Sequence, residues 1–189
     1  MTGPPCSGKS WLASALAERL DLPLLTKDAI KERLFETLGW GGAERSAAYN
    51  RASVALLLDS ARLLIATGRP FILESNLRPD RDSAAYAALL CEHGTQAIQI
   101  HCSAPPEVLI ERFQRRWEAG QRHPGHADDS AGASIADKIR AGIYGPLDLP
   151  GVLLSVDTAA GFAEQDTLLA EVQRHIEAIE RAAPQRRSE

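Results

Sequence analysis

The sequence has few cysteines and no long apolar run. Its 189 residues include three cysteines, Cys6, Cys91 and Cys102, which match no metal-binding spacing and cannot all pair with one another. Such cysteine usage suits a reducing compartment, so we expect a cytoplasmic protein. No apolar stretch approaches the roughly 20 residues that a membrane-spanning helix needs. We therefore expect no membrane partner.

The chain also lacks an excess of positive charge and is poor in aromatic residues. It has 21 Lys and Arg against 25 Asp and Glu, a net charge of −4, and 5% aromatic residues. This balance argues against nucleic acid as a partner. With 44% apolar and 24% charged residues, the composition is that of a globular domain. We expect one domain over residues 1–183, a disordered tail over 184–189, and a monomer or weak homodimer.

The opening residues fit the pattern of a phosphate-binding loop, G-x-x-x-x-G-K-[ST]. Glycines let the backbone amides turn toward a phosphate chain, Lys9 reaches the β- and γ-phosphates, and the Ser10 hydroxyl reaches Mg²⁺. Amide dipoles in this loop would favour the thiolate form of Cys6. We therefore expect ATP and Mg²⁺ as cofactors. The expected nucleotide-binding residues here are Gly3, Pro4, Pro5, Cys6, Ser7, Gly8, Lys9, Ser10 and Trp11.

The strand that normally precedes such a loop is missing from this chain. A helix follows the loop, since Leu12, Leu16 and Leu20 recur at every fourth residue. Only Met1 and Thr2 precede it, and two residues cannot form a strand of about five or six. Losing three or four apolar side chains would cost roughly 5–10 kcal/mol. Our hypothesis is that the native N-terminus lies further upstream, after a short apolar run.

Apolar strands alternate with helices along the rest of the chain, which predicts a parallel sheet covered on both faces. The strands are expected over residues 22–26, 71–74, 96–102 and 152–156. The helices are expected over about residues 10–20, 29–38, 44–67, 79–92, 105–117 and 162–182. Residues 120–132 are polar and rich in Gly, Pro and His, and we expect them to form a mobile loop.

Polar side chains follow the carboxyl ends of these strands, where ligands bind in open parallel sheets. Asp28 is the expected catalytic base, which accepts a proton from an attacking hydroxyl. It could also be the cap of the helix that begins after it. Glu74 is expected to hold Mg²⁺ or its water together with Ser10, although it could be a plain surface carboxylate. Asp157 and Thr158 follow the last strand.

Four arginines precede the last strand: Arg112, Arg115, Arg116 and Arg122. Arg112 and Arg116 share one helix face and could clamp the phosphates when a lid closes. A solvated face paired with neighbouring glutamates is the alternative. In the adjoining loop, His123, His126, Asp128 and Asp129 could form a metal site, but we favour a lid loop.

These motifs together resemble bacterial P-loop kinase-like ATPases of the zeta-toxin-like group, often called AAA-type ATP-binding proteins. They are also similar to chloramphenicol phosphotransferase and to the kinase domain of polynucleotide kinase. The stretches that carry the resemblance are GPPCSGKS (3–10), TKDAIKERL (26–34), ILESN (72–76), RFQRR (112–116), RHPGH (122–126) and SVDT (155–158).

The resemblance implies an α/β fold, a three-layer P-loop sandwich whose parallel sheet has strand order 2-3-1-4-5, with the missing strand in the middle. It implies that Asp28 activates the hydroxyl and that Arg112 and Arg116 are lid arginines near the phosphates and adenine. The turn at Asp157 and Thr158 would lie beside the adenine. Glu74 departs from the pattern, because relatives commonly have Asp there.

The function expected is that of an ATP-dependent kinase acting on a hydroxyl of a small molecule. Its catalytic residues would be Lys9, Asp28, Arg112 and Arg116, and its metal ligands Ser10 and Glu74. A polynucleotide 5′-hydroxyl kinase is one alternative. A nucleotide-binding ATPase or regulatory module without kinase activity is the other.

Overall fold

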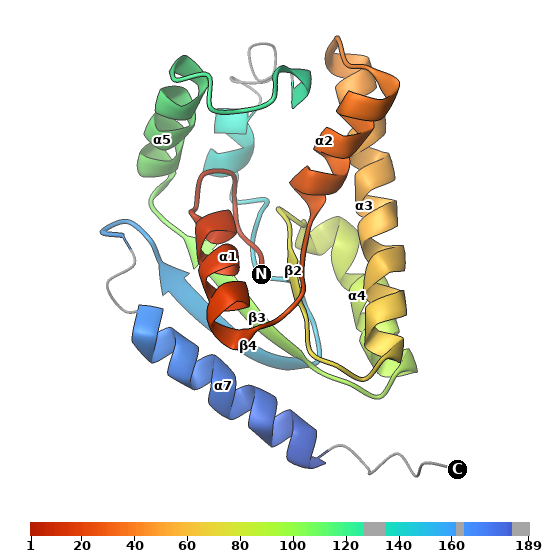
Figure 1. Cartoon of the computed structure of the whole chain (residues 1–189). Coiled ribbons are helices and arrows are strands. Elements are labelled where there is room, and N and C mark those ends of the chain that lie inside the picture. Colours follow the sequence, from red (N-terminus) through yellow and green to blue (C-terminus); the bar gives the residue numbers. More distant parts are fainter. Residues whose placement is uncertain (127–134, 162–164, 183–189) are drawn as a thin grey trace.

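Four parallel strands form the middle layer of the molecule (Figure 1). The computed structural model describes residues 1–126, 135–161 and 165–182. In these ranges β1 (Leu24–Thr26) pairs with β2 (Ile72–Glu74), and β3 (Ala97–Ser103) pairs with β4 (Gly151–Asp157). The tail expected over 184–189 lies outside the described residues.

Met1 and Thr2 join the two strand pairs. The Thr2 amide donates to the carbonyl of Ile100 at 2.9 Å, and the Thr2 carbonyl accepts from the amide of Cys102 at 3.0 Å. On the other side, the Met1 nitrogen donates to the carbonyl of Leu73 at 2.6 Å. These two residues therefore lie in the central position between β2 and β3. If they are counted as strand 1, and β1 to β4 as strands 2 to 5, the strand order is the predicted 2-3-1-4-5.

Helices cover both faces of the strands. On one face α1 (Lys9–Leu20) and α7 (Gln165–Ala182) bury leucines against β3 and β4. On the other, α3 (Ala43–Ala66) and α4 (Pro79–Glu92) pack around Leu77. Three further elements, α2 (Lys27–Leu38), α5 (Pro106–Glu118) and the short η1 (Pro124–His126), stand beyond the carboxyl ends of the strands (Figure 1). No helix of the described ranges is long and apolar enough to cross a membrane.

One local prediction was wrong. Asp28 does not cap α2, because the helix begins at Lys27, two residues earlier than expected, and the Thr26 hydroxyl accepts from the Ala29 amide at 3.2 Å. Within the expected mobile loop, Gly125 and His126 are buried, and the imidazole of His126 lies edge-on to the ring of Phe35. The remainder of that loop, 127–134, lies outside the described residues.

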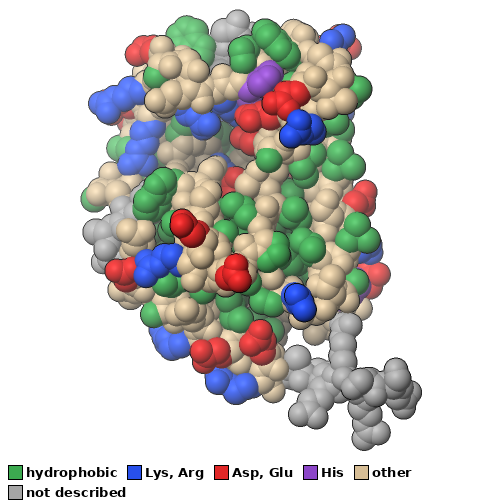
Figure 2. All heavy atoms as spheres, in the orientation of Figure 1, with side chains coloured by type: hydrophobic (Ala, Val, Ile, Leu, Met, Phe, Trp, Pro, Cys, Tyr) green, Lys and Arg blue, Asp and Glu red, His purple; other side chains and the backbone are tan. Residues whose placement is uncertain are grey.

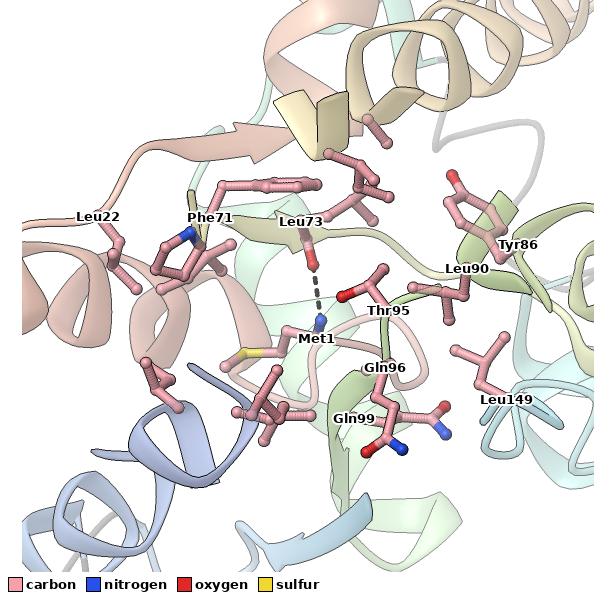
Figure 3. A pocket seen from close by; sticks show the side chains of 18 of the residues that line it. Met1, Leu22, Phe71, Leu73, Tyr86, Leu90, Thr95, Gln96, Gln99 and Leu149 are labelled. Carbon is pink, nitrogen blue, oxygen red and sulfur yellow. Dashed lines mark hydrogen bonds between the residues drawn. The ribbon is translucent and has the colours of Figure 1, made fainter. Parts of the chain in front are cut away.

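An apolar pocket of about 660 Å³ lies between β2 and β3, behind Met1 and Thr2 (Figure 3). The amides of Ile72 and Ala97 bond outward, to the carbonyls that precede β1 and β4. Because residues alternate sides in a parallel ladder, Leu73 and the isoleucines of β3 direct their backbone groups at the pocket. β2 and β3 are thus joined through Met1 and Thr2 near the carboxyl ends of the strands, and the pocket separates them nearer their amino ends.

Candidate active site

The phosphate-binding loop wraps around the N-terminus of α1. Gly3 has φ of 140°, and a Cβ there would lie 2.2 Å from the carbonyl oxygen of Cys102, so only glycine fits. Gly8 precedes the helix with φ of 76°, and no side chain caps the first turn. The first amides of α1 are therefore available to an anion, as a phosphate site requires.

Lys9 and Glu74 meet beneath this loop. The Lys9 ammonium lies 3.6 Å from Glu74 Oε1 and donates to the carbonyl of Pro4 at 3.4 Å. Both side chains are buried, and Ser10 follows in the first turn of the helix. The sheet thus brings the predicted phosphate ligand and the predicted metal ligand together.

The donor set fits a nucleotide with its magnesium ion. An ammonium, a carboxylate and a hydroxyl stand at a helix N-terminus, which are the groups that bind phosphates and a hard cation. In addition, the hydroxyls of Ser7 and Ser75 are buried and have no hydrogen-bond partner among the described residues. Buried hydroxyls of this kind are rarely left unsatisfied, so a ligand at the loop would complete them.

Asp28 stands at the start of α2 between two cations. Its Oδ1 lies 3.2 Å from the Lys27 ammonium, and its Oδ2 lies 3.4 Å from the guanidinium of Arg122. Burial would raise the pKa of Asp28, but Lys27 and Arg122 outweigh it and hold that pKa far below its usual range. The side chain is therefore a carboxylate at any physiological pH.

Lys27, which is not among the predicted site residues, lies next to Asp28 in the site. Its ammonium is buried, forms an ion pair with Asp28, and donates to the amide oxygens of Asn76 at 2.7 Å and Asn50 at 3.3 Å. Burial lowers the pKa of Lys27, while the neighbouring Asp28 opposes the change. The signal available was its place after β1, where it is the first of two consecutive charged residues at the carboxyl end of a strand.

Arg112 holds the turn that follows β4. Its guanidinium donates to the Thr158 carbonyl at 2.7 Å, to the Thr158 hydroxyl at 3.3 Å and to the carbonyl of Ala159 at 3.2 Å. The amide of Thr158 donates to the carbonyl of Ser103 at 2.8 Å. The Asp157 carboxylate accepts from the Ala159 amide at 2.8 Å. The structure therefore brings Arg112 together with both predicted turn residues.

Arg116 reaches the phosphate loop from α5, one turn after Arg112. It is exposed, and its positive charge acts on the thiol of Cys6. Burial nevertheless raises the pKa of that thiol, and this outweighs the cations of Arg116 and Lys9. The expectation of a favoured Cys6 thiolate was therefore wrong. Trp11, the last residue of the predicted nucleotide set, is 51% exposed beside the loop.

His126 links η1 to α2. Arg122 donates to its Nδ1 at 3.0 Å, and its Nε2 donates to Glu32 at 3.0 Å. Burial, aided by Arg122, lowers the pKa of His126 to about 3, so the ring is neutral. No group of three metal-ligating side chains occurs within the described ranges, and Asp128 and Asp129 lie outside them. The contacts of His126 are those of an anchor for the loop.

Figure 2 shows a hollow in the upper part of one face, with acidic and basic side chains around its rim. On that side of the sheet lie the phosphate loop, the end of β2 with Glu74, and the start of α2 with Asp28 (Figure 1). The electrostatics agree, because Lys9 and Arg122 both act on the carboxyl of Asp28 and on the thiol of Cys6. Cys6, Lys9 and Asp28 thus belong to one electrostatically coupled region.

A glycine-bounded loop at a helix N-terminus, with a lysine on that helix and parallel strands behind it, defines a P-loop nucleotide-binding fold. The sequence matches the family described as an AAA domain over residues 1–141, so the chain belongs to that family. No curated protein sequence matches it.

Solved structures share this fold. A candidate kinase from Chloroflexus aurantiacus J-10-fl is 37% identical, with a TM-score of 0.81 over 92% of this chain and 95% of that chain. A gluconokinase from Sinorhizobium meliloti 1021 is 19% identical, with a TM-score of 0.56 over 97% and 95% of the two chains. A sugar kinase from Janibacter sp. HTCC2649 is also 19% identical, with a TM-score of 0.53 over 96% and 95%. The likeness to the last two concerns the fold alone.

Proposed function

We propose that this protein is an ATP-dependent kinase that transfers the γ-phosphate of ATP to a hydroxyl group of a small molecule. One observation carries the proposal: the Asp28 carboxylate follows β1 at the carboxyl edge of the sheet, the same edge at which the phosphate loop and Glu74 lie. A carboxylate in that place suits an acceptor hydroxyl. The 37% identity to a candidate kinase supports the same class of reaction.

Nucleotide binding would rest on the phosphate loop. Lys9 and the amides of the loop bind the β- and γ-phosphates, and Ser10 and Glu74 hold Mg²⁺, directly or through a water molecule. When bound, the metal ion neutralises charge on the phosphate oxygens. Lys9 and Glu74 are only 3.6 Å apart, so Lys9 would contact the phosphates while Glu74 holds the Mg²⁺ that accompanies them.

Asp28 would orient the acceptor. Its carboxylate accepts a hydrogen bond from the hydroxyl, whose oxygen forms a bond to the γ-phosphorus while the bond to the bridging oxygen of ADP breaks. The proton passes to Asp28 and then to solvent. Because the pKa of Asp28 is strongly lowered, the proton moves late, which suits the loose transition state of phosphoryl transfer.

Arg112 and Arg116 of α5 would have separate roles. Arg116 stands at the phosphate loop and would stabilise the migrating phosphoryl group. Arg112 donates to the carbonyls of Thr158 and Ala159, so it would hold the turn beside the adenine. It would contact the phosphates only if these two hydrogen bonds were broken. Arg112 and Arg116 would thus have different roles, although the sequence pattern predicted the same role for both.

Two observations favour a small molecule over a polynucleotide as the acceptor. Lys31, which could hold a backbone phosphate in a polynucleotide kinase, is buried, and its ammonium donates to the Ser46 hydroxyl at 3.0 Å. The net charge of −4 adds no attraction for nucleic acid. A nucleotide-binding module without kinase activity is the other alternative.

A screen for acceptor-stimulated ADP release tests the proposal. Wild type, Asp28→Asn and the control Asp80→Asn, which changes an exposed acid on α4, are each given Mg·ATP with pools of sugars, sugar acids, nucleosides and antibiotics. We expect at least one pool to raise ADP release in the wild type and the control. Binding of ATP without stimulation by any acceptor would support the non-catalytic alternative.

A further inference from the structure

Building on the proposed kinase function, we propose that Lys27 is a positioning residue. Its buried ammonium donates hydrogen bonds to Asn50 on α3 and to Asn76, two residues after β2, and forms an ion pair with Asp28. It thereby fixes Asp28 relative to these two elements, and it does not contact the phosphates. The assignment separates Lys27 from Lys9, the buried lysine of the phosphate loop.

Side chains of the chain itself surround the Lys27 ammonium, which donates hydrogen bonds to Asn76 and Asn50 and forms an ion pair with Asp28. An ammonium has three N–H groups and no acceptor. Three oxygens surround it, Asn76 Oδ1 at 2.7 Å, Asp28 Oδ1 at 3.2 Å and Asn50 Oδ1 at 3.3 Å. A phosphate at Lys27 would have to displace one of them. Lys9 has longer contacts, 3.6 Å to Glu74 and 3.4 Å to the Pro4 carbonyl, and can exchange them for a nucleotide.

The three oxygens come from three separate parts of the fold. Asp28 lies in the first turn of α2, Asn50 lies on α3, and Asn76 follows the proposed metal ligand Glu74 by two residues. One cation therefore links the acceptor side of the site to the metal side. A misplacement of about 1 Å can lower a reaction rate about 100-fold, so a link of this kind matters for catalysis.

Lys27 also belongs to the same helix as the carboxylate that it holds. Four groups face Asp28: Lys27 from α2, Arg122 and the neutral His126 from the segment around η1, and Lys9 from α1. Of these, Lys27 and Arg122 lie within salt-bridge distance of the carboxylate. Removing the Lys27 cation is expected to leave Asp28 less strongly ionised and less firmly oriented.

Lys27→Met tests the proposal, because it keeps the length of the side chain and removes its donors. We expect kcat to fall about 100-fold, while the dissociation constant of Mg·ATP changes less than threefold. The acidic limb of the kcat–pH profile should move upward, toward the ordinary Asp value of about 4. Lys27→Arg should restore part of kcat, and the exposed Lys138→Met is the matched control.

A measurement without catalysis separates this proposal from the kinase proposal. Carbon-13 NMR of the aspartate carboxyls follows the titration of Asp28, which should shift upward in Lys27→Met whether or not an acceptor is known. Should that variant not fold, Asn50→Leu removes one of the three partners and should lower kcat by a smaller factor, again without a change in ATP affinity. An equal loss of ATP affinity and kcat, or an unchanged Asp28 titration, would overturn the assignment.

Discussion

Arg122 and Asp28 lie 94 residues apart in the chain, and Nη2 of Arg122 is 3.4 Å from Oδ2 of Asp28. The same guanidinium contacts Nδ1 of His126 at 3.0 Å. One side chain therefore ties the carboxylate proposed to activate the acceptor to the η1 turn. Because Lys27 holds the other oxygen of Asp28, the site compensates one negative charge with two positive ones.

Replacing Asp28 with Asn is expected to lower the free energy of unfolding near neutral pH, because two cations lose their common counter-charge. The pKa of Asp28 is lower in the folded than in the unfolded state. Its stabilising effect is therefore present above about pH 4 and fades as the pH falls through the folded value. Denaturant curves of both proteins at several pH values should show a gap that closes in strong acid. A gap independent of pH would contradict the electrostatic explanation.

His126 is expected to make the protein less stable as the pH falls from 6.5 toward 3. Its pKa is lowered from 6.5 to about 3, mainly by burial. Between these values the unfolded state binds a proton that the folded state does not, so stability decreases with decreasing pH. His126→Gln should have a flatter dependence of Tm on pH over that window. If thermal unfolding from pH 7.5 to 4 gives parallel curves, the ring is not buried in its neutral form.

Arg112→Met is expected to weaken ATP binding about tenfold without unfolding the protein. Three carbonyl and hydroxyl contacts to Thr158 and Ala159 are lost, and each hydrogen bond from a charged donor contributes roughly 1.5–3 kcal/mol. The backbone bonds of the turn to Ser103 remain. Isothermal titration calorimetry measures the change. Arg115→Met, which removes an exposed partner of Glu111, is the control and should leave the affinity unchanged.

An apolar extended segment fused ahead of Met1 is expected to raise Tm. A sequence such as Val-Ile-Val-Leu would place its backbone between β2 and β3 and its side chains in the 660 Å³ pocket. Burying three or four such side chains stabilises a protein by about 5 kcal/mol or more. The amides of Leu73 and Ile98 should then exchange hydrogen more slowly. A Gly-Ser segment of equal length is the control, and equal Tm values for the two fusions would contradict this account of the pocket.

Local chemistry explains which parts of the fold the sequence predicted. The order of strands and helices, and their bounds to within a few residues, follow from apolar runs bounded by Gly and Pro. The phosphate loop follows from its glycines and Lys9, since each of these residues acts through its own backbone or side chain. Helix α4 was predicted with the same limits that the structure has, 79–92, because Pro79 fixes its first residue.

Long-range contacts explain what was missed. The contacts that set Lys27 apart are to Asn50 and Asn76, which are 23 and 49 residues away. The composition of the loop around His126 predicts mobility but does not reveal the burial of His126 against Phe35 or its bond to Glu32. Nothing in a single sequence pairs these positions.

Two smaller errors arose where two local effects oppose each other. Thr26 and Asp28 can both cap a helix, and the extended backbone of Thr26 decided the matter. The thiol of Cys6 lies among favourable dipoles and cations, yet burial has the larger effect on its pKa. Both cases depend on the depth and orientation of a side chain, which the residue pattern does not contain.

The most direct test of the central claim is single-turnover transfer from ATP labelled at the γ-phosphate, with Mg²⁺ and an acceptor found in the screen. Wild type and Asp28→Asn are compared at saturating ATP, with binding checked by calorimetry. We expect the label to move from ATP to the acceptor in the wild type, and the rate to fall at least 100-fold in Asp28→Asn while ATP affinity stays within threefold. Transfer by Asp28→Asn at near the wild-type rate would contradict the account.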